Sequence, residues 1–176
     1  VEKISNRKFI PVMLFRQDND LLSSLNNVLD KWIIQSTQEY IHELHQAYGD
    51  YKLYKIRPII DTMIDRLSRW YIKLNKNRFK CFDSESAKKS YVALSVLYSV
   101  LFEIIVMIAP TIPFLTESIF QEMKKWRIDN GESVHLVRMI SMEKSSDLLK
   151  PMDDLIRVMK LCRYVRTDVK KIPFKQ

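Results

Sequence analysis

The chain has 176 residues, of which 47% are hydrophobic and 28% are charged, and this balance is typical of a folded globular protein rather than a disordered one. It contains only two glycines, which argues against glycine-rich phosphate loops and hairpin-rich β folds, because both need residues at positive φ. The formal net charge is +8, and this surplus favours an anionic partner, either nucleic acid or an acidic membrane surface.

The cysteines indicate the compartment of the protein, and the two ends of the sequence indicate whether it is a piece of a longer chain. Cys81 and Cys162 lie far apart and have no spacing typical of a disulfide framework, which is expected in a reducing, cytoplasmic compartment. The N-terminal residues lack the apolar segment of a signal peptide. There is no initiator methionine, and the sequence stops directly after a helical pattern. We therefore expect a piece of a longer protein.

The first half predicts an irregular start and two long helices. Residues 1–20 are short apolar pieces broken by proline, and a helical periodicity begins at Leu21, with Asp20 or Ser24 as its cap and Gly49 as its stop. A second helix runs from about residue 51 to 78. Pro58 lies inside it, so we expect a kink or two segments meeting there.

Residues 80–86 form a predicted loop that ends in a capping serine, Ser84 or Ser86, before a third helix over 87–109. This helix is the most apolar part of the chain, and its length approaches the roughly 20 residues of a membrane span. It carries Glu103 and several polar residues and lacks flanking anchors, so a buried core helix is the better interpretation.

Pro110 and Pro113 separate this helix from the next, which reaches residue 126 and has a predicted buried stripe of Leu115, Ile119 and Met123. A turn at 127–133 precedes a short strand or extended segment at 134–140. A last helix covers 151–169. Its predicted apolar face contains Leu155, Met159, Cys162, Val165 and Val169. The fold class predicted is all-α: a helical bundle, a trailing helix and one short extended segment.

The segment LSRWYIKLNKNRFK, residues 67–80, joins an apolar face to a basic one. On an ideal helix, one stripe within about 80° contains Ile60, Ile64, Leu67, Tyr71 and Leu74. A band roughly opposite this stripe contains Arg69, Lys73, Lys76 and Lys80, and Arg66 flanks it. The whole segment from residue 66 to residue 80 has six lysines and arginines and no acid. A merely solvated helix surface usually includes acidic partners four residues away.

The last helix repeats this pattern, because its basic residues are accompanied by a single acid, Asp168. They are Arg157, Lys160, Arg163, Arg166, Lys170, Lys171 and Lys175. Aromatic residues accompany both basic stripes: Trp70, Phe79, Tyr164 and Phe174. Cations neutralise phosphates and aromatic rings stack on unpaired bases, so the two stripes suit single-stranded or looped RNA. A solubilising basic surface is the simpler alternative and stays open at this point.

Three blocks, in this order and spacing, carry a family resemblance: NVLDKWIIQSTQEYI (27–41), the segment 51–80, and IAPTIPFLTESIFQEM (108–123). They resemble the motifs D-x-W-I-L, L-x-x-W-Y-[VI]-x-x-x-[NS]-x-x-R and A-P-x-x-P-F-L-x-E of the anticodon-binding domain of class I aminoacyl-tRNA synthetases. Within that family the chain is most similar to the isoleucyl type of the eukaryotic cytosol. Valyl relatives usually have an acid where this chain has Lys73.

The resemblance implies a helical bundle that docks the anticodon stem-loop. It divides the chain into a linker from a preceding catalytic domain (1–20), the bundle (21–130), and a connecting segment that starts a junction region (131–176). The H-I-G-H and K-M-S-K-S type motifs of the catalytic domain are absent. We therefore expect this chain alone to be inactive as a ligase and to hold no cofactor, with ATP and magnesium used by the full-length enzyme.

The expected partner is an isoleucine-accepting tRNA, bound by a monomer that makes no membrane contact. Phosphate contacts are assigned to Arg66, Arg69, Lys73, Lys76, Arg78 and Lys80, with Arg163 and Arg166 added from the last helix. Trp70 is expected to stack on a base, and Asn75 or Asn77 to bind base edges.

Other candidates have simpler explanations. His42 and His45, near Glu39 and Glu43, have a spacing that metal ligands use, but we expect exposed helix histidines. Asp61 and Asp65 are expected to pair with nearby arginines (Arg57, Arg66 or Arg69) rather than to act as an acid–base pair. The alternatives to an isoleucyl domain are a valyl or leucyl one, a basic helical protein-interaction module, and a peripheral membrane domain.

Overall fold

A computed structural model describes residues 11–16, 25–80, 84–126, 131–142 and 148–169. Within these ranges the chain is all-α and has no strand, which confirms the predicted fold class. The elements, in order, are α1 (Val28–Gly49), the 3₁₀ turn η1 (Leu53–Lys55), α2 (Ile56–Asp65), the π-helical turn η2 (Arg66–Ile72), α3 (Lys76–Phe79), α4 (Ser84–Ile108), α5 (Pro113–Lys124), the 3₁₀ turn η3 (Val134–Leu136), α6 (Leu149–Tyr164) and the π-helical turn η4 (Val165–Val169).

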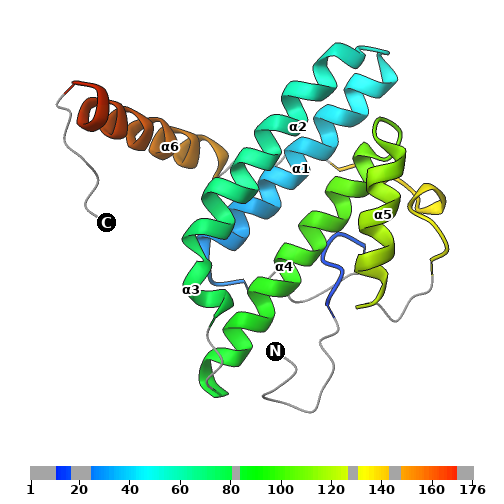
Figure 1. The fold of residues 1–176 in the computed structure, drawn as a ribbon, viewed down its shortest axis with the longest axis horizontal. Coiled ribbons are helices and arrows are strands. Elements are labelled where there is room, and N and C mark those ends of the chain that lie inside the picture. Colours follow the sequence, from blue (N-terminus) through cyan, green and yellow to red (C-terminus); the bar gives the residue numbers. More distant parts are fainter. Residues whose placement is uncertain (1–10, 17–24, 81–83, 127–130, 143–147, 170–176) are drawn as a thin grey trace.

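Helix α4 is the centre of the bundle. It packs against α1 and α3 on one side and α5 on another, while α2 lies beside α1 (Figure 1). The main core includes Trp32, Tyr71 and Met107, and a second cluster around Phe102 and Phe120 lies between α4 and α5. By length and composition Ala87–Ile108 could cross a membrane, but 72% of its most apolar window is buried inside the bundle. The prediction of a core helix is confirmed.

The ends of α1 differ in part from the prediction. Asn27 caps its N-terminus, since its side-chain oxygen accepts from the Leu29 N–H at 2.8 Å; the predicted caps Asp20 and Ser24 lie outside the described residues. At the other end α1 stops at Gly49, as predicted, but the positive φ that follows the helix belongs to Tyr51 (56°) and not to the glycine. Pro58 lies in the first turn of α2, where proline is tolerated, and it marks the junction of two segments.

The predicted core stripe of residues 60–74 is partly wrong. Ile64 and Leu74 are half exposed, whereas Met63, Trp70 and Asn75 are buried. For Leu74 and Asn75 the reason is η2, because a π-helical turn holds one more residue than an α-turn and shifts the inward-facing positions that follow it. The inward-facing positions of the whole segment occur at intervals of four: Met63, Leu67, Tyr71 and Asn75.

The predicted stripe of α5 is also partly wrong. Met123 packs against the second core cluster, but Leu115 is 54% exposed and Ile119 is 37% exposed, while Thr116 and Phe120 are the residues buried in the bundle. The Thr116 hydroxyl donates to the Ile112 carbonyl at 2.9 Å, and this bond allows a threonine to be buried at the start of the helix. Helix α5 is therefore rotated by about one residue from the pattern-based prediction.

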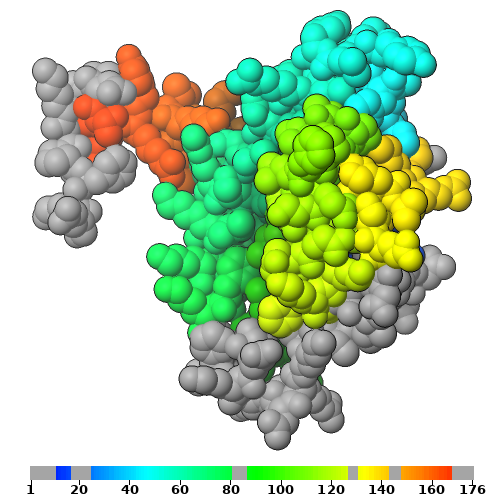
Figure 2. Space-filling view, turned by 45° about the vertical axis from the view of Figure 1, so that its right-hand side comes forward, coloured from blue at the N-terminus to red at the C-terminus, as the bar shows by residue number. Residues whose placement is uncertain are grey.

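Helix α6 contacts the bundle mainly through its first half. Leu149, Met152 and Ile156 are buried, and the Leu148 N–H donates to the Gln35 side-chain oxygen at 3.0 Å. The C-terminal end points away from the other helices (Figures 1 and 2). Of the predicted apolar face, Met159 packs partly buried against the main core, whereas Leu155, Cys162 and Val165 are exposed.

Residues 134–140, predicted as a short strand or extended segment, form no strand: they begin with the 3₁₀ turn η3 and continue as extended backbone at Val137. The Ser133 hydroxyl accepts from the His135 N–H and caps η3. Two histidines of α1 hold the segment that follows: a ring nitrogen of His45 lies 2.7 Å from the Ile140 carbonyl, and one of His42 lies 3.2 Å from the Met142 carbonyl. The two histidines are half-buried and bonded, so the prediction that they are exposed is wrong.

Residues 12–16 dock on α4. Arg16 donates to both oxygens of the fully buried Glu103, at 2.6 and 2.8 Å, and also to the Arg138 carbonyl at 2.9 Å. The Ser99 hydroxyl lies between the Leu14 N–H and the Val12 carbonyl. The one charged group in the apolar centre of α4 is thus neutralised by an arginine 87 residues away in sequence.

Candidate nucleic-acid interface

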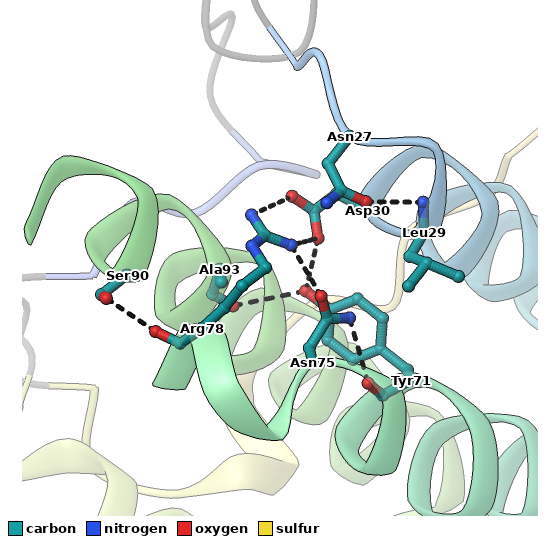
Figure 3. Close-up of polar contacts among 8 residues, drawn as sticks. All are labelled: Asn27, Leu29, Asp30, Tyr71, Asn75, Arg78, Ser90 and Ala93. Atoms are coloured by element: carbon teal, nitrogen blue, oxygen red, sulfur yellow. Dashed lines mark hydrogen bonds and ion pairs between the residues drawn. The ribbon is translucent and has the colours of Figure 1, made fainter. Parts of the chain in front are cut away.

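A buried polar network joins α1, η2 and α3 around Asp30, which is 1% exposed (Figure 3). Arg78 donates to both Asp30 oxygens at 2.9 Å, and the Tyr71 hydroxyl donates to one of them at 2.9 Å. Asn75 accepts from Arg78 at 2.8 Å and donates to the Tyr71 carbonyl at 3.0 Å. The Ser90 hydroxyl of α4 donates to the Arg78 carbonyl at 2.7 Å. The network around the Asp30 carboxylate therefore joins α1, η2 and α3, and the bond from Ser90 adds α4 to it.

In this network Arg78 stays charged and Tyr71 stays protonated. The hydrogen bond to Asp30 raises the pKa of the Arg78 guanidinium. Burial, and then the neighbouring Asp30 carboxylate, raise the pKa of the Tyr71 phenol, which therefore remains a donor. A buried charge is tolerated only when it is paired and hydrogen-bonded, and here both conditions are met.

Arg66 has a second structural role. It donates to Glu39 of α1 at 2.9 Å and to both oxygens of Asp153 of α6, at 3.1 and 2.9 Å. Its own side chain is mostly buried. Arg66 thus connects α1, η2 and α6, and it helps to set the position of α6 against the bundle.

Trp70 lies in the core and is 3% exposed. Its outer edge is covered by Arg163 of α6, whose guanidinium carbon lies 5.6 Å from the ring centre. Its indole N–H has no hydrogen-bond partner among the described residues. The ring has no free face for a base, so the expectation that Trp70 stacks on RNA is not compatible with this structure.

Four of the predicted RNA contacts therefore hold the fold together instead. Trp70 and Asn75 are buried, and Arg66 and Arg78 are engaged by carboxylates. The sequence assigned Asn75 and Arg78 to RNA through the family motif, and Arg66 and Trp70 through their positions beside the basic band. None of these signals reveals the carboxylates and core contacts that engage the four side chains. The partner of Arg78, Asp30, was missed, although both belong to the motif blocks that carried the resemblance.

The remaining predicted residues of this segment are exposed. They are Arg69, Lys73, Lys76, Asn77 and Lys80. The α6 segment adds four exposed cations, which are Arg157, Lys160, Arg163 and Arg166. Together, the eight cations of these two sets and Asn77 are called the basic surface below.

Asp65, at the end of α2, joins the two halves of the basic surface. One of its oxygens lies 2.9 Å from Arg69 Nε, and the other lies 4.0 Å from Lys160 Nζ of α6. The two basic stripes of the sequence, about ninety residues apart, are therefore neighbours in space. A single acid between two cations leaves a net positive charge at this junction, and the prediction that Asp65 pairs with arginine is confirmed.

No other chemistry competes with this surface in the part of the chain that the structure describes. No cluster of three metal-ligating side chains occurs there. Asp61 pairs with Arg57 at 3.7 Å, four residues before it, as predicted. Among the described residues, the basic surface is therefore the candidate site.

The comparison with known families agrees with this geometry. Residues 30–175 match the family model described as the anticodon-binding domain of tRNA ligase. The chain belongs to that family. The match begins at Asp30, the residue on which the buried network is built.

Isoleucine–tRNA ligases are among the proteins similar to this chain. The cytoplasmic enzyme of Schizosaccharomyces pombe is 31% identical over 156 residues, which are 84% of this chain and 14% of that protein. The cytoplasmic enzyme of Saccharomyces cerevisiae is 34% identical over 131 residues, 70% of this chain and 12% of that protein. The Treponema pallidum enzyme is 33% identical over 150 residues, and the match covers 83% of this chain and 13% of that protein. The chain thus spans about one seventh of the length of these relatives.

Proposed function

We propose that this chain is the tRNA-binding, anticodon-recognising part of an isoleucine–tRNA ligase. The observation that carries the proposal is the basic surface, in which the η2–α3 stripe and the α6 stripe adjoin at Asp65. Membership of the anticodon-binding family and the names of the similar proteins support it.

In this proposal the basic surface positions the sugar–phosphate backbone. Lys73, Lys76 and Lys80 contact phosphates as point charges, and Arg69 and Arg163 add planar donors. Asn77 is the exposed amide among these residues and is assigned to a base edge. The buried network has no contact with RNA in this scheme and keeps η2 and α3 in the orientation that presents the cations.

The rest of the ligase reaction belongs to parts of a longer protein. ATP and magnesium would bind there, and this domain would contribute by selecting the tRNA. We propose a cytoplasmic location, in keeping with the names of the two yeast relatives, and a monomeric domain. A valyl or leucyl ligase is the alternative, and the valine-accepting tRNA in the experiment below tests the first of these.

The test is fluorescence anisotropy with three tRNA transcripts: an isoleucine-accepting tRNA, the same tRNA with its anticodon exchanged, and a valine-accepting tRNA. Each is titrated at two salt concentrations against wild type, Lys73→Ala and Lys76→Ala. Each lysine variant is expected to weaken binding of all three RNAs and to reduce the slope of log affinity against log salt by about one. Lys125→Ala on α5 is the matched control, because this exposed lysine is paired with Glu122 and lies outside the basic surface.

Tighter binding of the native isoleucine tRNA than of its anticodon-exchanged form would support recognition by this domain. Asn77→Ala is expected to reduce that preference by about 1–3 kcal/mol while leaving the salt slope unchanged. Equal losses for Lys73→Ala and Lys125→Ala would contradict the basic surface as the RNA site. Preference for the valine tRNA would replace the isoleucyl assignment.

A further inference from the structure

The connection between α1 and α2, residues 50–57, presents aromatic rings to solvent and is called the α1–α2 tip here. Tyr51 is 88% exposed and Tyr54 is 75% exposed, with exposed Leu53 between them. The tip lies at the end of the bundle opposite to α3 (Figure 1). Rings in this position bury almost nothing in the fold, so packing does not account for them.

The backbone of the tip is also unusual. The Lys52 N–H donates to the Ala47 carbonyl at 2.9 Å and the Tyr51 N–H to the Tyr48 carbonyl at 3.1 Å, so the chain ends α1 with Tyr51 at a φ of 56°. Glycine normally takes this position, because a Cβ is strained there. A bulky ring held in a strained conformation, with no packing in return, points to a use outside the fold.

The α4–α5 connection lies at the same end of the molecule. The Tyr48 hydroxyl donates to the Met107 carbonyl at 3.0 Å and lies 2.8 Å from the Thr111 hydroxyl, which ties the end of α1 to the end of α4. Phe114, in the first turn of α5, is 91% exposed. Two chain connections therefore place three exposed rings at one end of the bundle.

Cations alternate with the tyrosines of the tip. Lys52, Lys55 and Arg57 are all exposed. Lys52 pairs with Asp50 at 2.7 Å, and Arg57 lies 3.7 Å from Asp61, but all four side chains are in solvent. Such surface pairs contribute little and can be exchanged for phosphate groups. Alternating aromatic and basic side chains are the combination that binds unpaired nucleotides, by stacking and by phosphate neutralisation.

We propose that the α1–α2 tip is a second RNA-contacting site, at which unpaired bases stack on Tyr51 and Tyr54 while Lys52 and Lys55 contact their phosphates. The inference rests on the proposed function and adds to it a site remote from the basic surface. The two sites are at different ends of the bundle, so they engage different parts of one tRNA.

The decisive variant is Tyr51→Gly, which removes the ring and the backbone strain together. In anisotropy titrations with the isoleucine-accepting tRNA transcript, it is expected to bind about tenfold more weakly. Its Tm is expected to equal or exceed that of wild type, because glycine suits a positive φ. Tyr54→Ala should lose affinity to a similar degree and Tyr54→Phe should retain it. Leu136→Ala, at another exposed apolar residue, is the matched control and should bind like wild type.

The outcomes separate the two proposals. If Tyr51→Gly and Tyr54→Ala bind as tightly as wild type while Lys73→Ala binds weakly, the tip is not an RNA site and the proposed function stands. An equal loss in Leu136→Ala would also overturn the tip site. If wild type binds none of the RNAs, both proposals are overturned, and the exposed rings then mark a surface for another protein.

Discussion

Asp30 and Arg78 are 48 positions apart, yet they form a two-point ion pair, with both N–O distances at 2.9 Å and the carboxylate out of contact with solvent. The pair connects the start of α1 to α3, the last element of the helical arm formed by α2, η2 and α3. The segment from η2 to Lys80, directly after α3, carries four cations of the basic surface, Arg69, Lys73, Lys76 and Lys80. The ion pair fixes this segment against α1 and therefore controls where those cations lie.

Asp30→Ala is expected to destabilise the protein by about 3–5 kcal/mol, since it leaves the Arg78 charge without its partner in a mostly buried site. The double variant Asp30→Leu/Arg78→Met should lose much less than the sum of the single losses. Urea unfolding followed by circular dichroism measures each value. Additive losses across the cycle would show that the two side chains do not interact, and Lys31→Ala, at an exposed neighbour, controls for helix effects.

Trp70→Phe separates a structural role from a binding one. The core position keeps an aromatic ring, so the cost is expected to be about 1 kcal/mol, and removal of an indole N–H without a partner offsets part of it. Affinity for the tRNA transcript should not change, because the ring is covered by Arg163. A clear loss of RNA affinity without loss of folded protein would mean that Trp70 becomes accessible when RNA binds.

The position of α6 depends on Asp153. Replacing it with alanine removes the two bonds from Arg66, and because Asp153 is half exposed the loss in global stability should be below about 1 kcal/mol. The local effect is larger, and amide hydrogen exchange should speed up along α6 while α1 and α4 keep their protection. Asp154→Ala, the exposed neighbour, should change neither. Unchanged exchange in Asp153→Ala would show that the bonds between Arg66 and Asp153 do not hold α6.

Glu117 gives the protein a measurable response to acid. It accepts hydrogen bonds from Gln121, Ser133 and the Val134 N–H, at 2.6, 2.8 and 2.9 Å, and these bonds, that from Gln121 first, hold its pKa below the ordinary value of 4.5. A lowered pKa in the folded state stabilises the protein above pH 4.5, and this contribution is lost as the pH falls through the folded-state value.

The comparison is between wild type and Glu117→Gln. The difference in unfolding free energy should be constant above about pH 5 and shrink as the pH drops below the ordinary pKa. Denaturant unfolding across this range gives the curve. A difference that does not vary with pH would mean that the carboxylate charge is irrelevant to η3.

The sequence predicted the overall fold because its long helices have strong periodicity, and the apolar segment of α4 has enough neighbours to be buried on most sides. It failed where tertiary contacts change the helical phase. Nothing in the local pattern of residues 66–72 announces a π-helical turn, so Leu74 was placed inside the bundle. Asn75 and Arg78 were assigned to RNA through the family resemblance, and Trp70 as an aromatic neighbour of the basic stripe.

The basic residues were a more reliable guide than the motif residues. Lys73, Lys76 and Lys80 are exposed as expected, since a lysine without a partner is rarely buried. Motif residues such as Asn75 and Arg78 were read as functional because they are polar, but here they satisfy a buried acid. Only the fold could reveal that acid as their partner, because the spacing between Asp30 and Arg78 follows no local rule.

The π-helical turn η2 also determines whether the segment from α2 to α3 tolerates the deletion of a residue. Since a turn of this kind holds one residue more than an α-turn, deletion of one exposed residue there, Ser68 or Arg69, would convert it to regular α-helix over nearly the same rotation. The residues that follow would keep their direction, and Arg78 would still reach Asp30. The segment from α2 to α3 can therefore lose one residue at η2 and keep the ion pair between Arg78 and Asp30. A deletion within α2 would instead rotate all the following residues of the helix by about 100°.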